Sequence, residues 1–192
     1  MKTIVIIIGL LTAAFTLKVN GQHEHHNMDH SSLDHGDMVM KHDVDKAFRE
    51  QLASVMTANQ KLNDAFVTGE AEDVKNAIEN VTTTLTAVDM KLLSGEAHMD
   101  WMNQSKVLKS QIEAMKSASS IEDQRKVFIT YNETLYKSVK AFGTEDQTVF
   151  YQYCPMANGG KGATWLSLIQ EIKNPYLGQK MLTCGSVKET IQ

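Results

Sequence analysis

The side chains with the most distinctive chemistry are two cysteines and two methionines near the C-terminus. Cys154 is followed two positions later by Met156, and the chain returns to the same chemistry at Met181 and Cys184. Thiolate and thioether are soft ligands, which suit Cu(I) better than zinc or a hard cation. An extended backbone allows Cys154 and Met156 to point to one side, and an offset of three puts Met181 and Cys184 on one face of a helical turn. The four residues are therefore a candidate Cu(I) site.

The same residues allow two simpler interpretations. The chain has only two cysteines, and in an exported protein such a pair is most simply a disulfide. Closing a loop of about 31 residues would stabilise the fold by roughly 3–4 kcal/mol on the chain-entropy account. Met156 and Met181 could also be ordinary core residues. Spacing alone leaves a soft-metal site and a disulfide both open.

Residues 22–43 hold a second concentration of metal ligands, with six of the seven histidines. This segment has almost no aliphatic content and no helical or strand period, which predicts a disordered tail. Imidazole is largely neutral near pH 7, and copper stands at the top of the affinity order for such ligands. We expect several weak copper sites here, with the donors His23, His25, His26, Met28, His30, His35, Met38, Met40 and His42.

His98 and Met102 form a weaker candidate pair. They lie four residues apart on a predicted helix, with Met99 beside them, so they could ligate a metal from one helix face. A lone histidine on a helix is more often a structural residue. The sequence contains no Ser-His-Asp or paired-carboxylate arrangement, so we do not expect an enzyme.

The N-terminus predicts export. Lys2 precedes an apolar stretch over residues 4–17, and residues 1–21 as a whole are typical of a cleaved signal peptide. A membrane anchor would need about 20 apolar residues. Removing Lys2 and Lys18 with this segment takes the formal net charge from -4 to -6. This charge argues against a nucleic-acid partner. We expect a periplasmic protein that is not inserted in the membrane after signal cleavage.

The elements that must position these ligands are helical. Between residues 45 and 142, hydrophobic residues recur at steps of three and four, and Gly69, Gly95 and Gly143 mark helix ends. Ser119 with Glu122, or Ser120 with Asp123, resembles a cap for the fourth helix. The pattern predicts an all-α fold, an antiparallel four-helix bundle.

The folded domain is expected over residues 44–192, with a small irregular C-terminal cap over residues 144–192 that carries the Cys/Met motif. Within this cap, Thr148–Tyr153 is β-prone and Leu177–Thr183 could form a short helix.

The C-terminal sequence also resembles a known family. The resemblance lies in the segments Tyr151–Ala157, Gly162–Ser167, Glu171–Gly178 and Met181–Gly185, preceded by Gln124, Arg125 and Phe128. These segments are similar to an exported bacterial domain, the domain-of-unknown-function 3347 family, over roughly residues 45–190. That family is associated with CusB-type heavy-metal efflux adaptors. The resemblance implies a helical envelope domain linked to copper or silver. By matching position, it makes Cys154, Met156, Met181 and Cys184 the candidate ligands.

Two functions follow as expectations. The first is a periplasmic accessory protein that binds copper or silver, for sequestration or for hand-over to an efflux adaptor. The second is a disulfide-stabilised envelope module for protein interaction, with no specific metal site in the folded domain. In that second case, Trp165 and Tyr176 would supply the binding surface.

Overall fold

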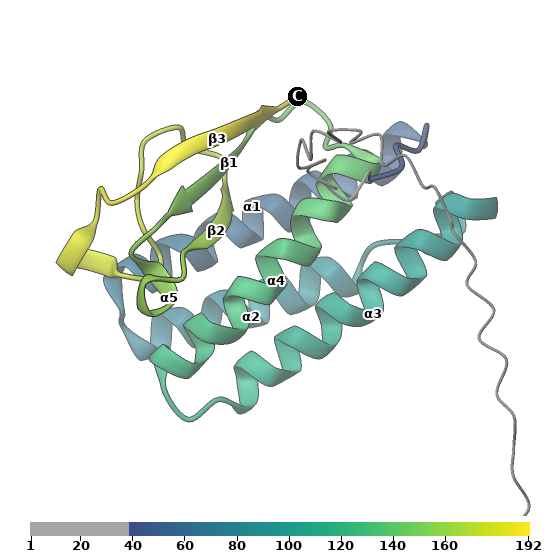
Figure 1. Cartoon of the computed structure of the whole chain (residues 1–192). Helices are drawn as coiled ribbons and strands as arrows, with labels where there is room; N and C mark the ends of the chain where they lie inside the picture. Colours follow the sequence, from purple (N-terminus) through teal and green to yellow (C-terminus); the bar gives the residue numbers. More distant parts are fainter. Residues whose placement is uncertain (1–38) are drawn as a thin grey trace, which may run out of the picture. The chain divides into compact units, whose positions relative to one another are not determined.

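The structure is a computed structural model that describes residues 39–192 (Figure 1). The predicted signal peptide, residues 1–21, and the predicted tail ligands from His23 to Met38 lie outside these residues. Within the described part of the chain, no helix is long and apolar enough to cross a membrane.

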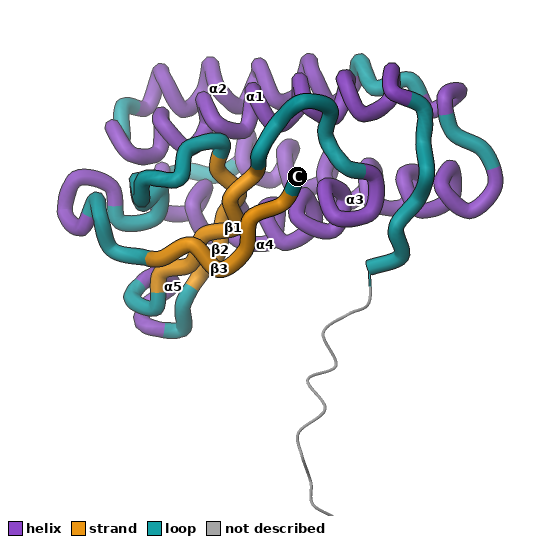
Figure 2. Tube along the Cα trace, turned by 90° about the horizontal axis from the view of Figure 1, so that it is seen from above, coloured by secondary structure: helices purple, strands orange, loops and turns teal. Residues whose placement is uncertain are grey.

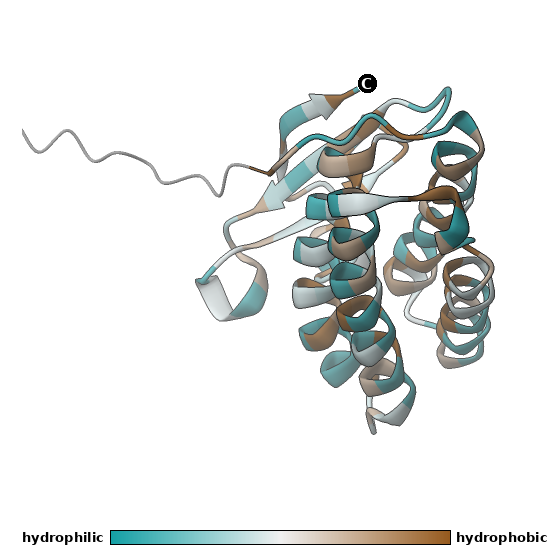
Figure 3. Ribbon diagram, turned by 90° about the vertical axis from the view of Figure 1, so that its right-hand side faces the viewer, coloured by the Kyte–Doolittle hydropathy of each residue, from teal (hydrophilic) through white to brown (hydrophobic). Residues whose placement is uncertain are grey.

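Four long helices dominate the described chain. They are α1 (Lys46–Thr68), α2 (Ala71–Thr86), α3 (Gly95–Ser117) and α4 (Ile121–Phe142). Their ribbons carry both hydrophobic and hydrophilic residues (Figure 3), as expected of amphipathic helices. Gly69 caps the C-terminus of α1, and its φ of 76° is left-handed. Ser120 caps the N-terminus of α4: its hydroxyl accepts a hydrogen bond of 3.1 Å from the Asp123 amide, which confirms one of the two predicted caps.

The connection between the second and third helices lies at a different place in the sequence from the one predicted. Gly95 was expected to end the second helix, but α2 ends at Thr86 and Gly95 is the first residue of α3. A single turn of 3-10 helix, η1 (Met90–Leu92), lies between them. Val88 and Leu93 in this connection are buried in the core. The hydrophobic spacing therefore continues past Thr86, so the sequence pattern does not show where α2 ends.

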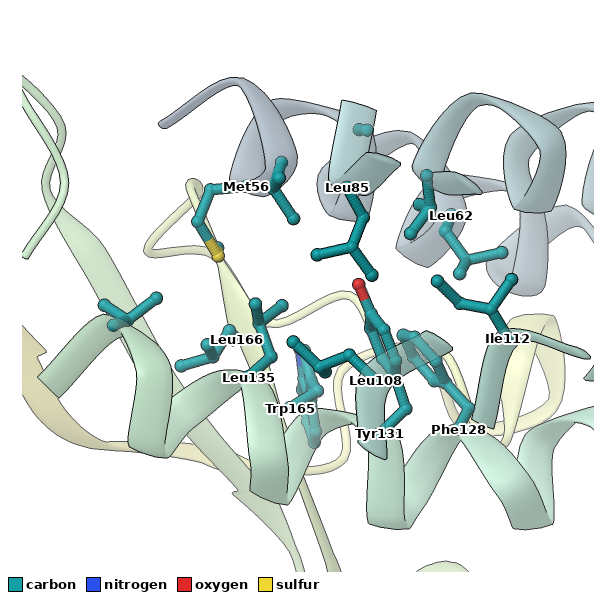
Figure 4. Close-up of a cluster of buried hydrophobic side chains, with 14 of the residues drawn as sticks. Met56, Leu62, Leu85, Leu108, Ile112, Phe128, Tyr131, Leu135, Trp165 and Leu166 are labelled. Carbon is teal, nitrogen blue, oxygen red and sulfur yellow. The ribbon is translucent and has the colours of Figure 1, made fainter. Parts of the chain in front are cut away.

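One hydrophobic core connects the four helices with part of the C-terminal region (Figure 4). Phe48 of α1, Trp101 of α3 and Phe142 of α4 contact one another with ring centroids 5.3–5.8 Å apart. All three side chains are at most 2% exposed. Burying a large apolar side chain stabilises the fold by about 1.5–3 kcal/mol, so aromatic clusters of this kind hold together helices that would not be stable alone.

The C-terminal region contains a small antiparallel sheet, which corrects the all-α prediction. Its strands are β1 (Val149–Cys154), β2 (Ala163–Ser167) and β3 (Ser186–Ile191), drawn in orange in Figure 2. Their order in the sheet is β2-β1-β3 (Figure 1). The short helix α5 (Ala157–Gly160) and the 3-10 turn η2 (Gly178–Met181) lie in its connections. The β-prone segment Thr148–Tyr153 is confirmed as the central strand.

Three buried asparagines attach the sheet to the helices. The side-chain amides of Asn59 and Asn63 on α1 donate to the carbonyl oxygen of Leu166, at 3.2 and 2.7 Å. The amide of Leu166 donates to Oδ1 of Asn132 on α4, at 3.0 Å. Leu166 lies in β2, and its neighbour Trp165 is 1% exposed in the same core. Both polar groups of one strand residue are thus satisfied by helix side chains, which fixes the position of the sheet.

A second attachment joins α4 to the end of α1 and to the loop before η2. Arg125 donates through Nη2 to the carbonyl oxygen of Phe66, at 2.6 Å, and through Nε to that of Pro175, at 2.9 Å. Phe66 lies in the last turn of α1, where unpaired carbonyl groups favour a cation. One guanidinium therefore positions the loop that leads to Met181 and Cys184.

Candidate metal centre

The structure brings the two cysteines together at one end of the sheet. Cys154 is the last residue of β1, and Cys184 lies two residues before β3. β1 and β3 are antiparallel neighbours with Tyr153 opposite Ser186, so the chain approaching β3 passes the end of β1. The two Sγ atoms are 3.0 Å apart. The predicted convergence of the two halves of the motif is observed for the cysteines.

The loop around Cys184 is also held by contacts to its backbone that involve no sulfur atom. Asn174, which is fully buried, donates from Nδ2 to the carbonyl oxygen of Cys184 at 2.8 Å. The amide of Cys184 donates to the carbonyl oxygen of Met181 at 3.1 Å. A Cβ atom on Gly185 would lie 2.9 Å from the carbonyl oxygen of Tyr153, so this close approach requires glycine. The cysteine is therefore held in place before any metal or disulfide forms.

Sequence reasoning identified Asn174-Pro175-Tyr176 only as a turn and missed the role of Asn174. The Oδ1 atom of Asn174 accepts from the amides of Tyr176 and Leu177, at 2.9 and 3.0 Å. Its Nδ2 then reaches Cys184. The Asn-Pro pair was the available signal, because an asparagine that bonds amides two and three residues ahead is a common turn device.

The two thiols differ in their exposure to solvent. Cys154 is fully buried, and Cys184 is half-buried. The hydrogen bond with Cys154 raises the pKa of the Cys184 thiol above its ordinary value, and burial adds to the rise, while a backbone hydrogen bond from Met156 opposes it. In the reduced protein the raised pKa favours the thiol form of Cys184 at neutral pH. Metal binding at Cys184 must displace this proton.

Met156 and Met181 are surface residues, which argues against the core interpretation. Met156 is 54% exposed and Met181 is 42% exposed, whereas Met56 and Met115 are fully buried. Large apolar side chains are normally placed inside. Of the six large hydrophobic residues exposed in the described chain, five are methionines. The thioethers of Met156 and Met181, two and three residues from the cysteines in the sequence, are thus accessible to solvent.

The spacing of the two sulfur atoms can be compared with the requirements of a metal and of a disulfide. Two thiolates bound at about 2.3 Å in a tetrahedral arrangement stand roughly 3.8 Å apart, and disulfide sulfurs stand about 2.0 Å apart. The observed 3.0 Å lies between these values. The donor set fits a soft metal, and a sub-ångström widening of the pair would admit one. No group of three or more His, Cys, Asp or Glu residues suited to a metal occurs within residues 39–192, so a site here depends on thioethers.

The other predicted ligands lie elsewhere in the domain. His98 is half-buried on α3, and Met102 is exposed on the same helix. Met40 is 58% exposed. His42, which we assigned to the tail, contacts the folded domain: its Nε2 is 2.7 Å from Oδ2 of Asp100, and its ring stacks on Phe142. This last tail histidine therefore has structural partners.

The predicted aromatic binding surface is wrong. Trp165 is 1% exposed and Tyr176 is 6% exposed, and their rings contact each other edge-on with centroids 6.0 Å apart. The Tyr176 hydroxyl donates to the carbonyl oxygen of Thr164 at 2.6 Å. Both aromatic residues belong to the core beneath the sheet, because bulky rings there fill the space between strand and helices.

Fold and site together define a mostly helical domain with a close pair of thiols at one end of its small antiparallel sheet. Residues 55–147 match the model of a family described as a protein of unknown function (DUF3347), which supports the predicted family. The matched residues run from α1 through α4 and end before β1, so the Cys/Met motif lies outside them. No curated protein and no solved structure matched the chain.

Proposed function

We propose that the protein is a copper-binding, or silver-binding, accessory protein of the cell envelope. The proposal depends on one observation, the approach of the Cys154 and Cys184 sulfurs to 3.0 Å. Met156 and Met181 follow and precede these cysteines by two and three residues in the sequence, and both are exposed. Thiolate and thioether donors together favour Cu(I) over zinc and over hard cations. The helices, which we interpret as an antiparallel four-helix bundle, serve as the scaffold.

The proposal also gives a role to the predicted signal peptide and to the predicted tail. Residues 1–21 direct export, and the His/Met-rich tail collects copper by mass action through several weak sites. The Cys/Met site takes Cu(I) from the tail and holds it for sequestration or for transfer to an efflux adaptor. Because Cys184 is half-buried and the two methionines are exposed, the metal would enter from the side of Cys184.

A Cu(I) competition titration on the reduced full chain tests this site. Against a strong chelator, the wild type should hold one more equivalent than the double variant Cys154→Ser/Cys184→Ser. The tail is present in both proteins, so the difference reports the folded site alone. Met156→Leu/Met181→Leu should weaken that equivalent by about tenfold or more, a size typical of disturbed metal sites.

The matched control is Met56→Leu/Met115→Leu, which removes two buried thioethers and should leave Cu(I) affinity unchanged. Circular dichroism would verify that each variant folds. Equal stoichiometry in the wild type and the cysteine variant would exclude the proposed site.

The second candidate, a disulfide-stabilised interaction module, is favoured by the same 3.0 Å separation. Exported proteins meet an oxidising environment in which such a pair forms a disulfide. Mass analysis of the protein taken from the envelope, without reductant, separates the two. A quantitative loss of two hydrogens would establish the disulfide and leave no thiolate for copper.

A further inference from the structure

The first turns of α3 place one imidazole and two exposed thioethers on one arc of the helix. At 3.6 residues per turn, His98, Met99 and Met102 lie within about 100° of one another around the axis, with Met102 in the middle. Met102 is four residues from His98 and three from Met99, and residues at these offsets are neighbours on a helix surface. One imidazole and two thioethers can therefore reach a common point.

The His98 ring is already oriented for ligation. Its Nδ1 lies 3.2 Å from the carbonyl oxygen of Met90, in η1. A carbonyl oxygen only accepts hydrogen bonds, so Nδ1 must carry the proton in this contact. In the neutral ring, Nε2 then has a free lone pair. Histidine ligands in metal sites are commonly held in this way, with one nitrogen bonded to a carbonyl group and the other facing the metal.

The exposure of the two thioethers has no explanation in the packing. Met99 is 53% exposed and Met102 is 38% exposed, while Trp101 between them is 1% exposed and supplies the core contact of this turn. The helix thus buries its aromatic residue and leaves both methionines in solvent. The carboxylate next in sequence, Asp100, is 2.7 Å from His42 Nε2 and so has its own partner. Glu96 and Asp100 both fall outside the arc of about 100° that His98, Met99 and Met102 span, so the donors on this arc are an imidazole and two thioethers.

We propose that His98 Nε2 and the thioethers of Met99 and Met102 form a second soft-metal site, specific for Cu(I) or Ag(I). Imidazole and thioether donors suit monovalent copper and silver, and the absence of a carboxylate from the set disfavours hard cations. The site contains no thiol. It therefore keeps its affinity when Cys154 and Cys184 are oxidised, and it stands or fails independently of the proposed Cys/Met centre.

The test uses the full chain with 13C-labelled methionine methyl groups, titrated with Ag(I) and followed by NMR. Ag(I) is a diamagnetic, redox-stable substitute for Cu(I), and each methyl signal reports one residue, so tail binding does not interfere. Met99→Leu and Met102→Leu assign the two signals. The Met99 and Met102 methyl signals should move together along one binding curve, while those of buried Met56 and Met115 stay in place.

The decisive variant is His98→Asn. The asparagine amide can take the place of Nδ1–H toward the Met90 carbonyl, whereas the Nε2 ligand is lost. Ag(I) affinity at Met99 and Met102 should fall by at least about tenfold, the lower end of what a disturbed metal site loses. An unmoved Met56 methyl signal would show that the variant is folded.

Two results would overturn the proposal. Methyl signals of Met99 and Met102 that stay in place while those of Met156 and Met181 shift would exclude a site on α3. Signals that move equally in the wild type and in His98→Asn would show separate thioether contacts rather than a site. In either case the exposed methionines would fit better a surface for a protein partner, since methionine is common on such surfaces.

Discussion

At the Cys/Met centre, some residues supply the candidate ligand atoms and others fix the position of those ligands. Cys154 is fully buried, and the turn that follows it, Pro155 and Met156, is exposed to solvent. Cys184 is placed by Asn174 and by the close fit of Gly185, neither of which has a soft donor atom. A ligand pair prepared in this way loses little conformational entropy on binding, which favours affinity.

Buried asparagines hold the sheet at the residue scale, and Asn132 is the most informative of them. In Asn132→Ala the buried amide of Leu166 loses its acceptor, which is 3.0 Å away in the wild type. We expect the free energy of unfolding to fall by about 1–3 kcal/mol, the cost of an unpaired buried polar group. Urea unfolding measures it. Asn76→Ala on the exposed face of α2 is the control and should change stability little; equal effects in both variants would contradict the proposed role of Asn132.

At the scale of elements, the helices could be predicted and two of the strands could not. α1 and α4 have regular hydrophobic spacing and polar caps, so both ends were close to their observed positions. β3 alternates exposed with half-buried residues and carries Lys188 and Glu189, so no hydrophobic run marks it. β2 is only five residues long and takes its place from Asn59, Asn63 and Asn132, which are far away in sequence.

The candidate site shows the same division. The mirrored Cys/Met spacing predicted that Cys154 and Cys184 can meet, and the structure brings these two thiols together. The convergence of Met156 and Met181 on them stays a prediction. The contacts that place Cys184 could not be predicted, because the bond from Asn174 spans ten residues of irregular loop. Only a folded loop decides which buried carbonyl group an asparagine reaches.

The attachment of the cap to the helices through Arg125 gives a prediction at the element scale. Arg125→Lys keeps the charge but cannot bond the Phe66 and Pro175 carbonyl groups together, because an ammonium group lacks the planar fork. We expect a loss of about 1.5–3 kcal/mol in unfolding free energy, the range for hydrogen bonds to charged groups. Chemical denaturation of the variant would measure this loss. Exposed Lys109→Arg is the reverse control, and a null result for Arg125→Lys would contradict the attachment.

A pH dependence follows from the contact between the start of α1 and the segment after α4. Glu145 accepts from Arg49 Nε at 2.8 Å, and this hydrogen bond, with the nearby positive charge, lowers the pKa of the carboxyl group. A lowered pKa stabilises the fold above the ordinary glutamate value, and the stabilisation is lost as the pH falls through the lowered pKa. The difference in unfolding free energy between the wild type and Glu145→Gln, here called the stability gap, should therefore shrink from about pH 7 to about pH 3.

Thermal unfolding across that pH range would measure the gap. Glu133→Gln, at an exposed position on α4, is the matched control and should show a gap that does not change in this way. A gap for Glu145→Gln that stayed constant or widened toward acid would contradict the assigned contact with Arg49.

At the scale of the whole molecule, the sheet depends on the helices more than the helices depend on the sheet. β2 contacts both α1 and α4, and its Trp165 and Leu166 enter the helical core, as the close-up of that core shows (Figure 4). β3 lies at the far edge of the sheet and is at most half-buried. The Cys/Met centre thus lies between the central strand, whose Cys154 belongs to the core, and the start of the edge strand β3. A covalent or metal link there would tie this edge strand to the core.

The state of the cysteine pair therefore links stability to metal binding. Oxidation would close the chain between Cys154 and Cys184, and a loop of this size stabilises by roughly 3–4 kcal/mol, or about 6–16 °C in Tm for a domain of this length. The same reaction removes both thiolates, so the oxidised protein should melt higher and hold one Cu(I) fewer than the reduced protein. Calorimetry with and without reductant, followed by the Cu(I) competition, measures both on one sample. In the double variant Cys154→Ser/Cys184→Ser, the presence or absence of reductant should change neither Tm nor the copper stoichiometry. If oxidation raised Tm without changing the copper stoichiometry, the pair would be a structural disulfide, and the copper would be bound elsewhere in the chain.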